Sequence, residues 1–454
     1  MSGASPQRDD AMSPGSGLLF RCATCGGYTP AGAAGPRCTC NGLFDPRVYR
    51  DNANGASSSP QRPGAITPSE IPEVRELGEF ATPLLRRTLG GSEVYVKYEA
   101  VLPTGSYKDR GARTLIGACR ALRIPRVVED SSGNAGAAIA AYAAAAGIEA
   151  EIFVQHNAAP AKVRQIAAYG ARVTTVSGSR EDVARAAREA AAGDGAAREA
   201  AAPGPTGRGG AGAASSYYAS HVYNPLFLAG VQSAADEIVE EIAVPDVIYL
   251  PVGNGALILG LAEGFRRLGG MPRLVAVQTA AVSPIYDAWR RTSPAPGGTS
   301  PAPGGPRPYR ELSAGLPQPA VPPSPPAPVS APAPAAPTGP TIADGVAVAV
   351  PARLEEIVAV VSESGGAVVT VSDDEIRAAQ RVLAETGLYA EPTGALAAAG
   401  YLAHAAERRP GAAGKSAAPG PRHTPGPRHT PGPRHAPGET AVVFLTGSGL
   451  KEQS

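Results

Sequence analysis

The sequence predicts an α/β fold in which mostly parallel sheets are covered by helices. Short runs rich in β-branched residues alternate with longer segments of helical pattern, which is typical of that class. Loops rich in Gly, Ser, Thr and Asn follow several of these runs, at the place where such folds bind their ligands. The 454 residues are enough for two or three domains. The net charge of +1 gives no reason to expect nucleic acid or an anionic membrane as a partner.

Four segments rich in Pro, Gly and Ala are expected to be disordered and to contribute nothing to a core. They are residues 1–17, 187–216, 293–340 and 410–438, the last with a Pro-Gly-Pro-Arg-His-Thr repeat. The chain holds 55 Gly and 47 Pro, well above the usual combined share of about 12%. The remaining sequence has a suitable size for a two-domain enzyme. Because it contains no apolar run typical of a membrane span or a signal peptide, we expect a cytoplasmic protein without a membrane partner.

The individual elements follow from local composition and periodicity. Strands are expected where Val, Ile, Thr and Tyr cluster, and helices where longer runs of Ala, Leu, Arg and Glu occur. The expected strands are 93–98, 126–129, 151–154, 172–176, 247–251, 273–278, 367–371 and 441–445. The expected helices are 108–122, 135–146, 161–169, 180 onward, 231–242, 257–268, 373–385 and 394–406.

The most informative motif is Thr104-Gly105-Ser106-Tyr107-Lys108-Asp109-Arg110-Gly111, which places a lysine between a Ser/Gly turn and a helix. Outward-pointing backbone N–H groups and partial burial would favour the neutral amine, which is a nucleophile. Lys108 is therefore a candidate for a Schiff base with an aldehyde cofactor. The alternative is a surface lysine that pairs with Asp109 at the start of a helix.

Three further loops lie at the ends of expected strands. Ser131-Ser132-Gly133-Asn134-Ala135-Gly136 offers hydroxyls, an amide and a helix start to a carboxylate or phosphate, or is only a helix cap. Pro251-Val252-Gly253-Asn254-Gly255-Ala256-Leu257 allows backbone N–H groups to approach an anion closely. Leu445-Thr446-Gly447-Ser448-Gly449-Leu450-Lys451 supplies hydroxyls after the last strand, or is a C-terminal turn.

The four motifs, in this order, resemble those of the fold-type II pyridoxal-phosphate enzymes, and within that group the threonine synthases most closely. The resemblance also includes Gly78 to Leu84, which ends in Thr-Pro-Leu, Asn224-Pro225, and Glu391-Pro392-Thr393-Gly394-Ala395. It implies two α/β domains, each a mostly parallel sheet flanked by helices, and a homodimer. The large cofactor-binding domain would comprise 70–108 plus 223–450, and the small mobile domain 109–222.

The resemblance also implies residue roles. Lys108 would bind pyridoxal 5'-phosphate covalently and act as the catalytic residue. Asn134 would bind the phenolic oxygen and Thr446 the ring nitrogen, while Glu391 would lie near the ring or only lead the following helix. The cofactor phosphate would be held by Gly253, Asn254, Gly255, Ala256 and Leu257. The substrate would be held by Ser131, Ser132, Ala135, Ser179, Arg180 and Asn224.

The resemblance implies a pyridoxal-phosphate-dependent lyase that converts O-phosphohomoserine and water to threonine and phosphate. Residues 178–183 differ from the G-N-x-D-[DE]-A pattern of the threonine synthases, and 229–233 from their E-G-Q-K-T pattern. Arg180 could bind the substrate phosphate or be a solvated residue at a helix start. A threonine/serine dehydratase or another β-elimination or replacement enzyme is an alternative, although Ala135 to Ala137 lack the dehydratase His and Gln. A non-catalytic protein that binds the cofactor is a further alternative.

Two other features carry possible chemistry. Cys22, Cys25, Cys38 and Cys40 form two closely spaced pairs within 18–50, a zinc-knuckle-like module that could hold structural zinc or reduced thiols. His221, close to Asn224, could border the active site or be a satisfied loop histidine.

Overall fold

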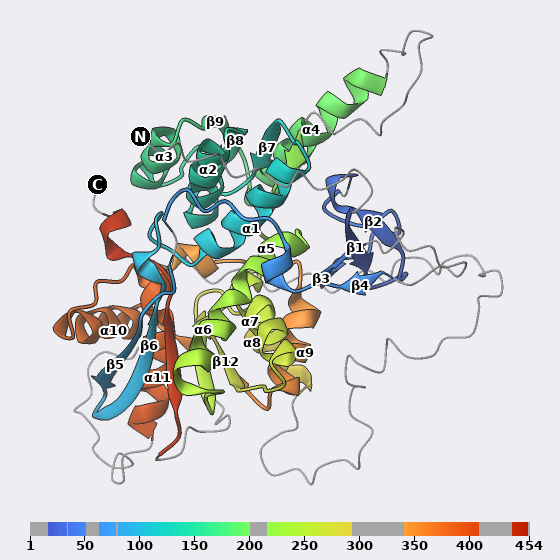
Figure 1. The fold of residues 1–454 in the computed structure, drawn as a ribbon. Coiled ribbons are helices and arrows are strands. Elements are labelled where there is room, and N and C mark those ends of the chain that lie inside the picture. The colour runs from blue at the N-terminus through green and yellow to red at the C-terminus, as the bar shows by residue number, and fades with distance from the viewer. Residues whose placement is uncertain are drawn as a thin grey trace, which may run out of the picture.

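The computed structural model describes residues 17–33, 35–50, 63–78, 80–199, 216–292, 340–407 and 438–452. Most of the segments that were expected to be disordered lie outside these ranges. The described chain forms three sheets (Figure 1). In that view the small parallel sheet lies above the large sheet, and the N-terminal sheet lies to one side.

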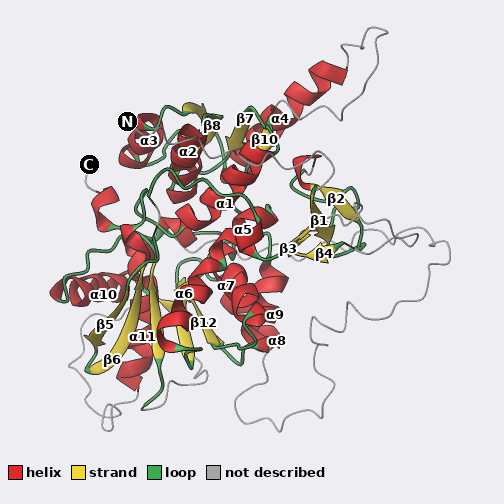
Figure 2. Ribbon diagram, in the orientation of Figure 1, coloured by secondary structure: helices red, strands yellow, loops and turns green. Residues whose placement is uncertain are grey.

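The largest sheet has six strands in the order β13–β12–β11–β14–β6–β5. All its neighbours pair in parallel except β5 and β6, which form an antiparallel hairpin. Strands β11, β12, β13 and β14 are almost completely buried on both faces, as expected where helices cover a sheet (Figure 2). The bounds are β5 Leu84–Leu89, β6 Ser92–Tyr98, β11 Val247–Pro251, β12 Arg273–Thr279, β13 Ala367–Val371 and β14 Ala441–Leu445.

Helices cover both faces of this sheet. Helix α11 packs along β11, β12, β13 and β14, while α7 and α9 belong to the larger apolar core on the other side. The bounds are α6 Ser233–Ile242, α7 Ala256–Arg267, α8 Pro284–Thr292, α9 Leu354–Glu363, α10 Asp373–Glu385 and α11 Pro392–Glu407.

The second sheet is fully parallel, in the order β10–β7–β8–β9. Helix α1 lies between this sheet and the large one, because it packs against both α2 and α5. The strands are β7 Arg126–Glu129, β8 Glu149–Gln155, β9 Arg172–Val176 and β10 Tyr217–Tyr218. The helices are α1 Lys108–Ala121, α2 Asn134–Ala146, α3 Pro160–Ala168, α4 Arg180–Glu199 and α5 Pro225–Val231.

The N-terminal sheet is antiparallel, with the order β2–β1–β3–β4. Its buried aromatic residues Phe20 and Phe44 pack at a tilted angle, with ring centroids 5.5 Å apart, and join the main core. Strand β3 packs against α5, so the sheet is attached to the main body of the molecule. The bounds are β1 Leu18–Cys22, β2 Tyr28–Pro30, β3 Phe44–Arg50 and β4 Gly64–Ala65.

The predicted fold class is confirmed, and five strands begin and end where expected. The N-terminal sheet, β5, β10, α8 and α9 were not expected. The helix expected at 231–242 is α6, which begins at Ser233. The helix before it, α5, was not expected; Asn224 caps it, and Pro225 lies in its first turn. Among the described residues, no helix combines the length and apolar character needed to cross a membrane.

The expectation of disorder from residue 187 was wrong for its first part. Helix α4 continues to Glu199, and Ala187 is fully buried against a small apolar cluster that includes Val183 and Phe153. Alanine and arginine are strong helix formers, so a composition that resembled a linker instead continues a helix. Ser216, at the other end of the segment, is also buried.

Candidate functional site

A cavity surrounds Lys108 at the carboxyl ends of β11 and β14. This is the edge at which parallel sheets bind ligands. The described residues that line it come from six separate segments: Tyr107, Lys108, His221, Pro251, Gly253, Asn254, Gly255, Ala256, Leu257, Gly345, Val346, Thr393 and Thr446. Of the residues predicted to bind the cofactor, only Asn134 does not line it.

Lys108 is the first residue of α1 and is half-buried. Its Nζ donates to Tyr107 Oη at 2.8 Å and lies 4.2 Å from the centroid of the Tyr107 ring. The lysine loop is tied to the C-terminal loop, because the Tyr107 N–H donates to the Thr446 carbonyl at 3.1 Å. Two segments more than 300 residues apart in sequence, as their numbers show, therefore share one site.

Asp109 closes the turn that precedes Lys108. Its carboxylate is fully buried and accepts from the Thr104 N–H at 2.6 Å and from the Thr104 hydroxyl. A surface pair of Lys108 with Asp109 is therefore not the arrangement in the structure. Asp109 instead shapes the turn that presents the lysine.

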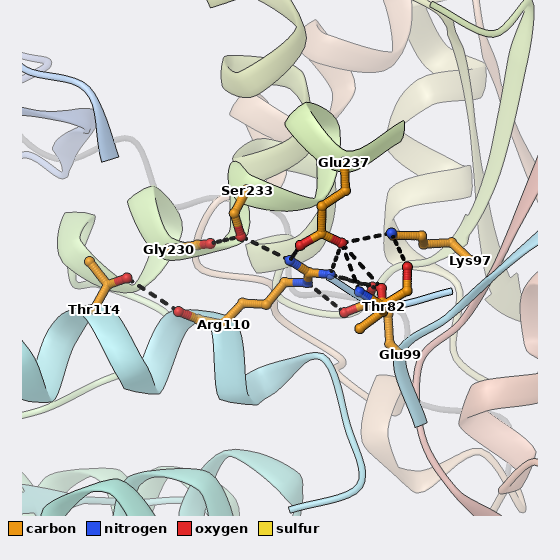
Figure 3. A network of polar contacts seen from close by, with 8 residues as sticks. All are labelled: Thr82, Lys97, Glu99, Arg110, Thr114, Gly230, Ser233 and Glu237. Carbon is orange, nitrogen blue, oxygen red and sulfur yellow. Dashed lines mark hydrogen bonds and ion pairs between the residues drawn. The ribbon is translucent and has the colours of Figure 1, made fainter. Parts of the chain in front are cut away.

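A buried ionic network fixes the first turn of α1 to β6 and α6 (Figure 3). Arg110 donates to Glu99 Oε2 at 2.6 Å and to both oxygens of Glu237 at 2.7 Å. Lys97 Nζ lies 2.7 Å from Glu237 Oε2, and Thr82 donates to Glu99 at 2.8 Å. Burial would raise the pKa of Glu237, but the hydrogen bonds and charges of Arg110 and Lys97 outweigh it and lower the pKa to about 2.

The Gly253–Leu257 loop connects β11 to α7. Gly255 has a φ of +89°, and a Cβ there would lie 2.6 Å from Ile357 Cδ1. A Cβ on Gly253 would lie 3.1 Å from Val346 Cα. Both positions therefore suit glycine. The loop ends at the start of the 12-residue helix α7, whose first residues line the cavity and whose first N–H groups have no partner within the helix. Such a donor set, with an amine in the same cavity, fits a group that carries both a phosphate and an aldehyde.

The Ser131–Gly136 loop leads into α2, whose first residue is Asn134. Asn134 Nδ2 donates to Glu391 Oε1 at 2.7 Å across 257 positions of sequence. A Cβ on Gly136 would lie only 1.9 Å from the Ser131 carbonyl oxygen, so the loop requires glycine there. The Ser131 hydroxyl accepts from the Gly133 N–H at 3.3 Å. The loop that contains Ser131, Ser132 and Ala135 is thus connected through Asn134 to the start of α11.

Three other predicted substrate residues have structural partners. Ser179 exchanges hydrogen bonds with Asp182 in the first turn of α4, and Asn224 caps α5 and donates to Tyr217 Oη at 2.7 Å. Arg180 Nη1 lies 2.7 Å from the buried carboxylate of Asp130. None of the three lines the Lys108 cavity.

An acid and a histidine next to the site have perturbed proton affinities. His221 Nδ1 lies 2.6 Å from Glu129 Oε1. Burial, reinforced by the Asp130 carboxylate, raises the pKa of Glu129 well above its ordinary value. Burial and the charges of Lys108 and Arg180 lower the pKa of His221 well below its ordinary value. The motifs gave no reason to expect Glu129 here, and the cavity-lining residues Gly345, Val346 and Thr393 were not expected either.

The four N-terminal cysteines converge at one end of the β1–β3 sheet. Their sulfur atoms all lie within 4.8 Å of one another, with Cys22 and Cys40 at 3.5 Å and Cys25 and Cys38 at 3.7 Å. A tetrahedral zinc site with Zn–S bonds of about 2.3 Å places its sulfurs about 3.8 Å apart. The spacing therefore fits four thiolates around one zinc ion.

The chain is similar in sequence and in fold to several known proteins. The chain is 26% identical over 408 residues to the threonine synthase of Methanocaldococcus jannaschii, and the alignment covers 84% of this chain and 86% of that protein. It is 28% identical over 337 residues to the threonine synthase of Mycobacterium tuberculosis, and this alignment covers 71% of this chain and 76% of that protein. Maize serine racemase superposes with a TM-score of 0.55 at 18% identity, over 82% of this chain and 88% of that one. The processed form of threonine deaminase isoform 2 from Solanum lycopersicum also superposes with a TM-score of 0.55 at 18% identity, over 84% of this chain and 81% of that one. At these identities the solved structures support the fold alone.

A family model described as pyridoxal-phosphate dependent enzyme matches residues 75–414. This range holds Lys108, the glycine loop and the Asn134 loop. It extends over most of the chain, and the fold and the cavity agree with it. The chain therefore belongs to the pyridoxal-phosphate dependent enzymes of fold type II.

Proposed function

We propose that this enzyme is a threonine synthase-like lyase that converts O-phosphohomoserine and water to threonine and phosphate. The observation that carries the proposal is the joint placement of Lys108, the Gly253–Leu257 loop and Thr446 around one cavity. The relatives called threonine synthase, which align over most of both chains, support this choice of reaction.

Each group of residues would have a separate task. Lys108 would bind the cofactor aldehyde and move protons at Cα and Cβ of the substrate. The N–H groups of the Gly253–Leu257 loop would hold the cofactor phosphate. Thr446 would face the ring nitrogen and Asn134 the phenolic oxygen. When bound, the cofactor supplies an electron sink for the carbanion at Cα.

The Asn134 loop would bind the amino acid. Hydroxyls of Ser131 and Ser132 and the N–H of Ala135, at the start of α2, suit a carboxylate. Arg180 lies close to this loop through its pair with Asp130, and its guanidinium is half-exposed. A guanidinium that keeps donors available can bind a phosphate bidentately, so Arg180 is our candidate for the substrate phosphate. Ser179 and Asn224 would act by holding α4 and α5 in place.

Three further properties belong to the same proposal. The small domain, 109–222, would move relative to the large domain, which comprises 70–108 plus 223–450. Cys22, Cys25, Cys38 and Cys40 would hold a structural zinc ion. Two copies of the chain would form a homodimer.

Product analysis tests the proposed reaction. Purified protein loaded with cofactor is incubated with O-phosphohomoserine, and in parallel with threonine and with serine. The expected result is release of phosphate and threonine in equal amounts. Keto-acid formation from threonine or serine without phosphate release would instead identify a dehydratase. Cofactor binding without any turnover would refute both reactions for these substrates.

A further inference from the structure

Glu129 and His221 form a buried pair beside the Lys108 cavity. His221 lines the cavity, and its Nδ1 lies 2.6 Å from Glu129 Oε1. The Glu129 side chain is completely buried at the end of β7, and that of His221 is 11% exposed. The roles proposed above for Lys108, Asn134 and the glycine loop use neither residue.

The surroundings determine how many protons the pair holds. The cations whose charges act on the pair are Lys108 from α1 and Arg180 from α4, and Arg180 forms an ion pair with Asp130. Tyr218 from β10 also donates to Asp130, at 2.9 Å. Burial raises the pKa of Glu129 and lowers that of His221, so it favours a neutral carboxylic acid beside a neutral imidazole.

This protonation state fixes the tautomer of the histidine. With the proton on the carboxyl group, Glu129 Oε1 donates to Nδ1 of His221, so the imidazole proton is on Nε2. The ring also packs edge-on against Phe227, with centroids 6.0 Å apart, which restricts its rotation. Nε2 is then the ring atom that remains for a ligand in the cavity.

We propose that Glu129 and His221 act as one proton relay for the oxygen chemistry of the reaction, while Lys108 handles protons on carbon. The inference rests on the proposed function, because it assigns a step of that reaction. The neutral pair can give a proton through Nε2 and take one back through the same atom, without ever forming a buried imidazolium.

The proposed step balances over one turnover. As the bond from Cγ to the phosphate oxygen breaks, the phosphate leaves with the bonding electrons and takes the Nε2 proton. Nδ1 takes the Glu129 proton at the same time, which leaves a carboxylate. When the water oxygen bonds to Cβ, the water proton goes to Nε2 and the Nδ1 proton returns to Glu129. One proton has thus passed from water to phosphate, and the relay is restored.

Two substitutions separate proton transfer from orientation. Glu129→Gln keeps a donor to Nδ1 and so retains the ring orientation, but it has no proton to transfer. His221→Gln removes the ring. We expect each to lower kcat for phosphate release about 100-fold with little change in KM, because general acid–base catalysis typically contributes at least that factor. As members of one unit, the two together should cost no more than either alone.

A matched control comes from a second buried histidine. His404 also uses Nδ1, which lies 3.0 Å from Tyr249 Oη, but it is in α11, about 16 Å along the helix from Thr393. His404→Gln should leave kcat within about twofold of wild type. Phosphate release by Glu129→Gln at a rate within about threefold of wild type would overturn the relay and leave Glu129 as a positioning residue.

A spectroscopic readout does not depend on turnover. In protein labelled with ¹⁵N-histidine, the His221 signals are those lost in His221→Gln. They should show the neutral Nε2–H tautomer and stay unchanged between about pH 5.5 and 8.5, whereas an ordinary histidine titrates near pH 6.5. Titration of His221 in that range, or an Nδ1–H tautomer, would overturn the inference. If wild type releases no phosphate, the proposed function fails, and with it the assigned step. If wild type releases phosphate and the variants release it at the same rate, the relay alone fails.

Discussion

Replacement of Glu237 by glutamine should destabilise the fold strongly at neutral pH and only weakly in acid. Glu237 accepts from Arg110 and Lys97, two cations whose side chains are 2% and 0% exposed (Figure 3). Its own side chain is 15% exposed, so solvent screens these contacts little. The amide keeps the shape of the side chain but leaves Glu99 as the one carboxylate in this network for two buried cations.

The magnitude follows from the pKa of Glu237. Folding lowers it from the ordinary 4.5 to about 2. At roughly 1.4 kcal/mol per pKa unit, this difference corresponds to about 3 kcal/mol of stability. Because the folded-state pKa is the lower one, the stabilisation is fully present above about pH 4.5 and is lost as the pH falls toward 2. Removal of one partner from a buried ion pair typically costs about 3 to 5 kcal/mol, which agrees with the stability worked from the pKa of Glu237.

Urea unfolding at several pH values measures this effect. The free energy of unfolding of Glu237→Gln should lie about 3 kcal/mol below that of wild type at pH 7. The gap should shrink as the pH falls below 4.5, the ordinary pKa of the group. Glu240→Gln, at an exposed position of the same helix α6, is the control and should match wild type at every pH. A gap that is absent at pH 7, or that does not change with pH, would refute the reasoning.

Three other substitutions test the site and the cysteine module. Lys108→Ala should abolish phosphate release and the borohydride-stable cofactor adduct seen by mass spectrometry; a retained adduct would place the Schiff base elsewhere. Gly255→Ala should weaken cofactor binding at least tenfold in a fluorescence titration, because a Cβ would displace the loop, whereas Gly269→Ala, with nothing within 4 Å of its Cβ, should not. Cys38→Ser should reduce zinc from one equivalent to a small fraction by elemental analysis, and Cys119→Ala, in α1, should retain it.

Local sequence patterns determined the fold class and most of the elements around the site. Val, Ile and Tyr at 247–251 favour a strand covered on both faces, and the glycines that follow permit the tight loop into the next helix. The β-branched residues at 126–129 and 441–445 likewise favour strands. Such signals act over a few residues, so they can be read without knowing the rest of the chain. They made Lys108 a candidate for the Schiff-base residue, and the resemblance of the four motifs to the fold-type II enzymes favoured that role over a surface lysine.

The boundaries of low-complexity segments were less predictable. Composition alone assigned 187–199 to a linker, although Ala187 packs against the small sheet. An alanine-rich helix has no strong apolar stripe, so burial of one face depends on the surface that it meets. The antiparallel N-terminal sheet was missed for a related reason, because its short strands are interrupted by the cysteine turns.

The sequence by itself thus determined the α/β class, the loops at the strand ends and the position of Lys108 between a turn and a helix. These features depend on the backbone preferences of neighbouring residues. Only the tertiary structure decided which side chains meet. Asn134 and Glu391 are 257 positions apart, and Arg110 and Glu237 are 127 apart. Glu129 and His221 come together because β7 ends beside the loop that follows β10. Contacts at such separations depend on how the sheets and helices pack, and burial then sets the proton affinities of the groups that they bring together.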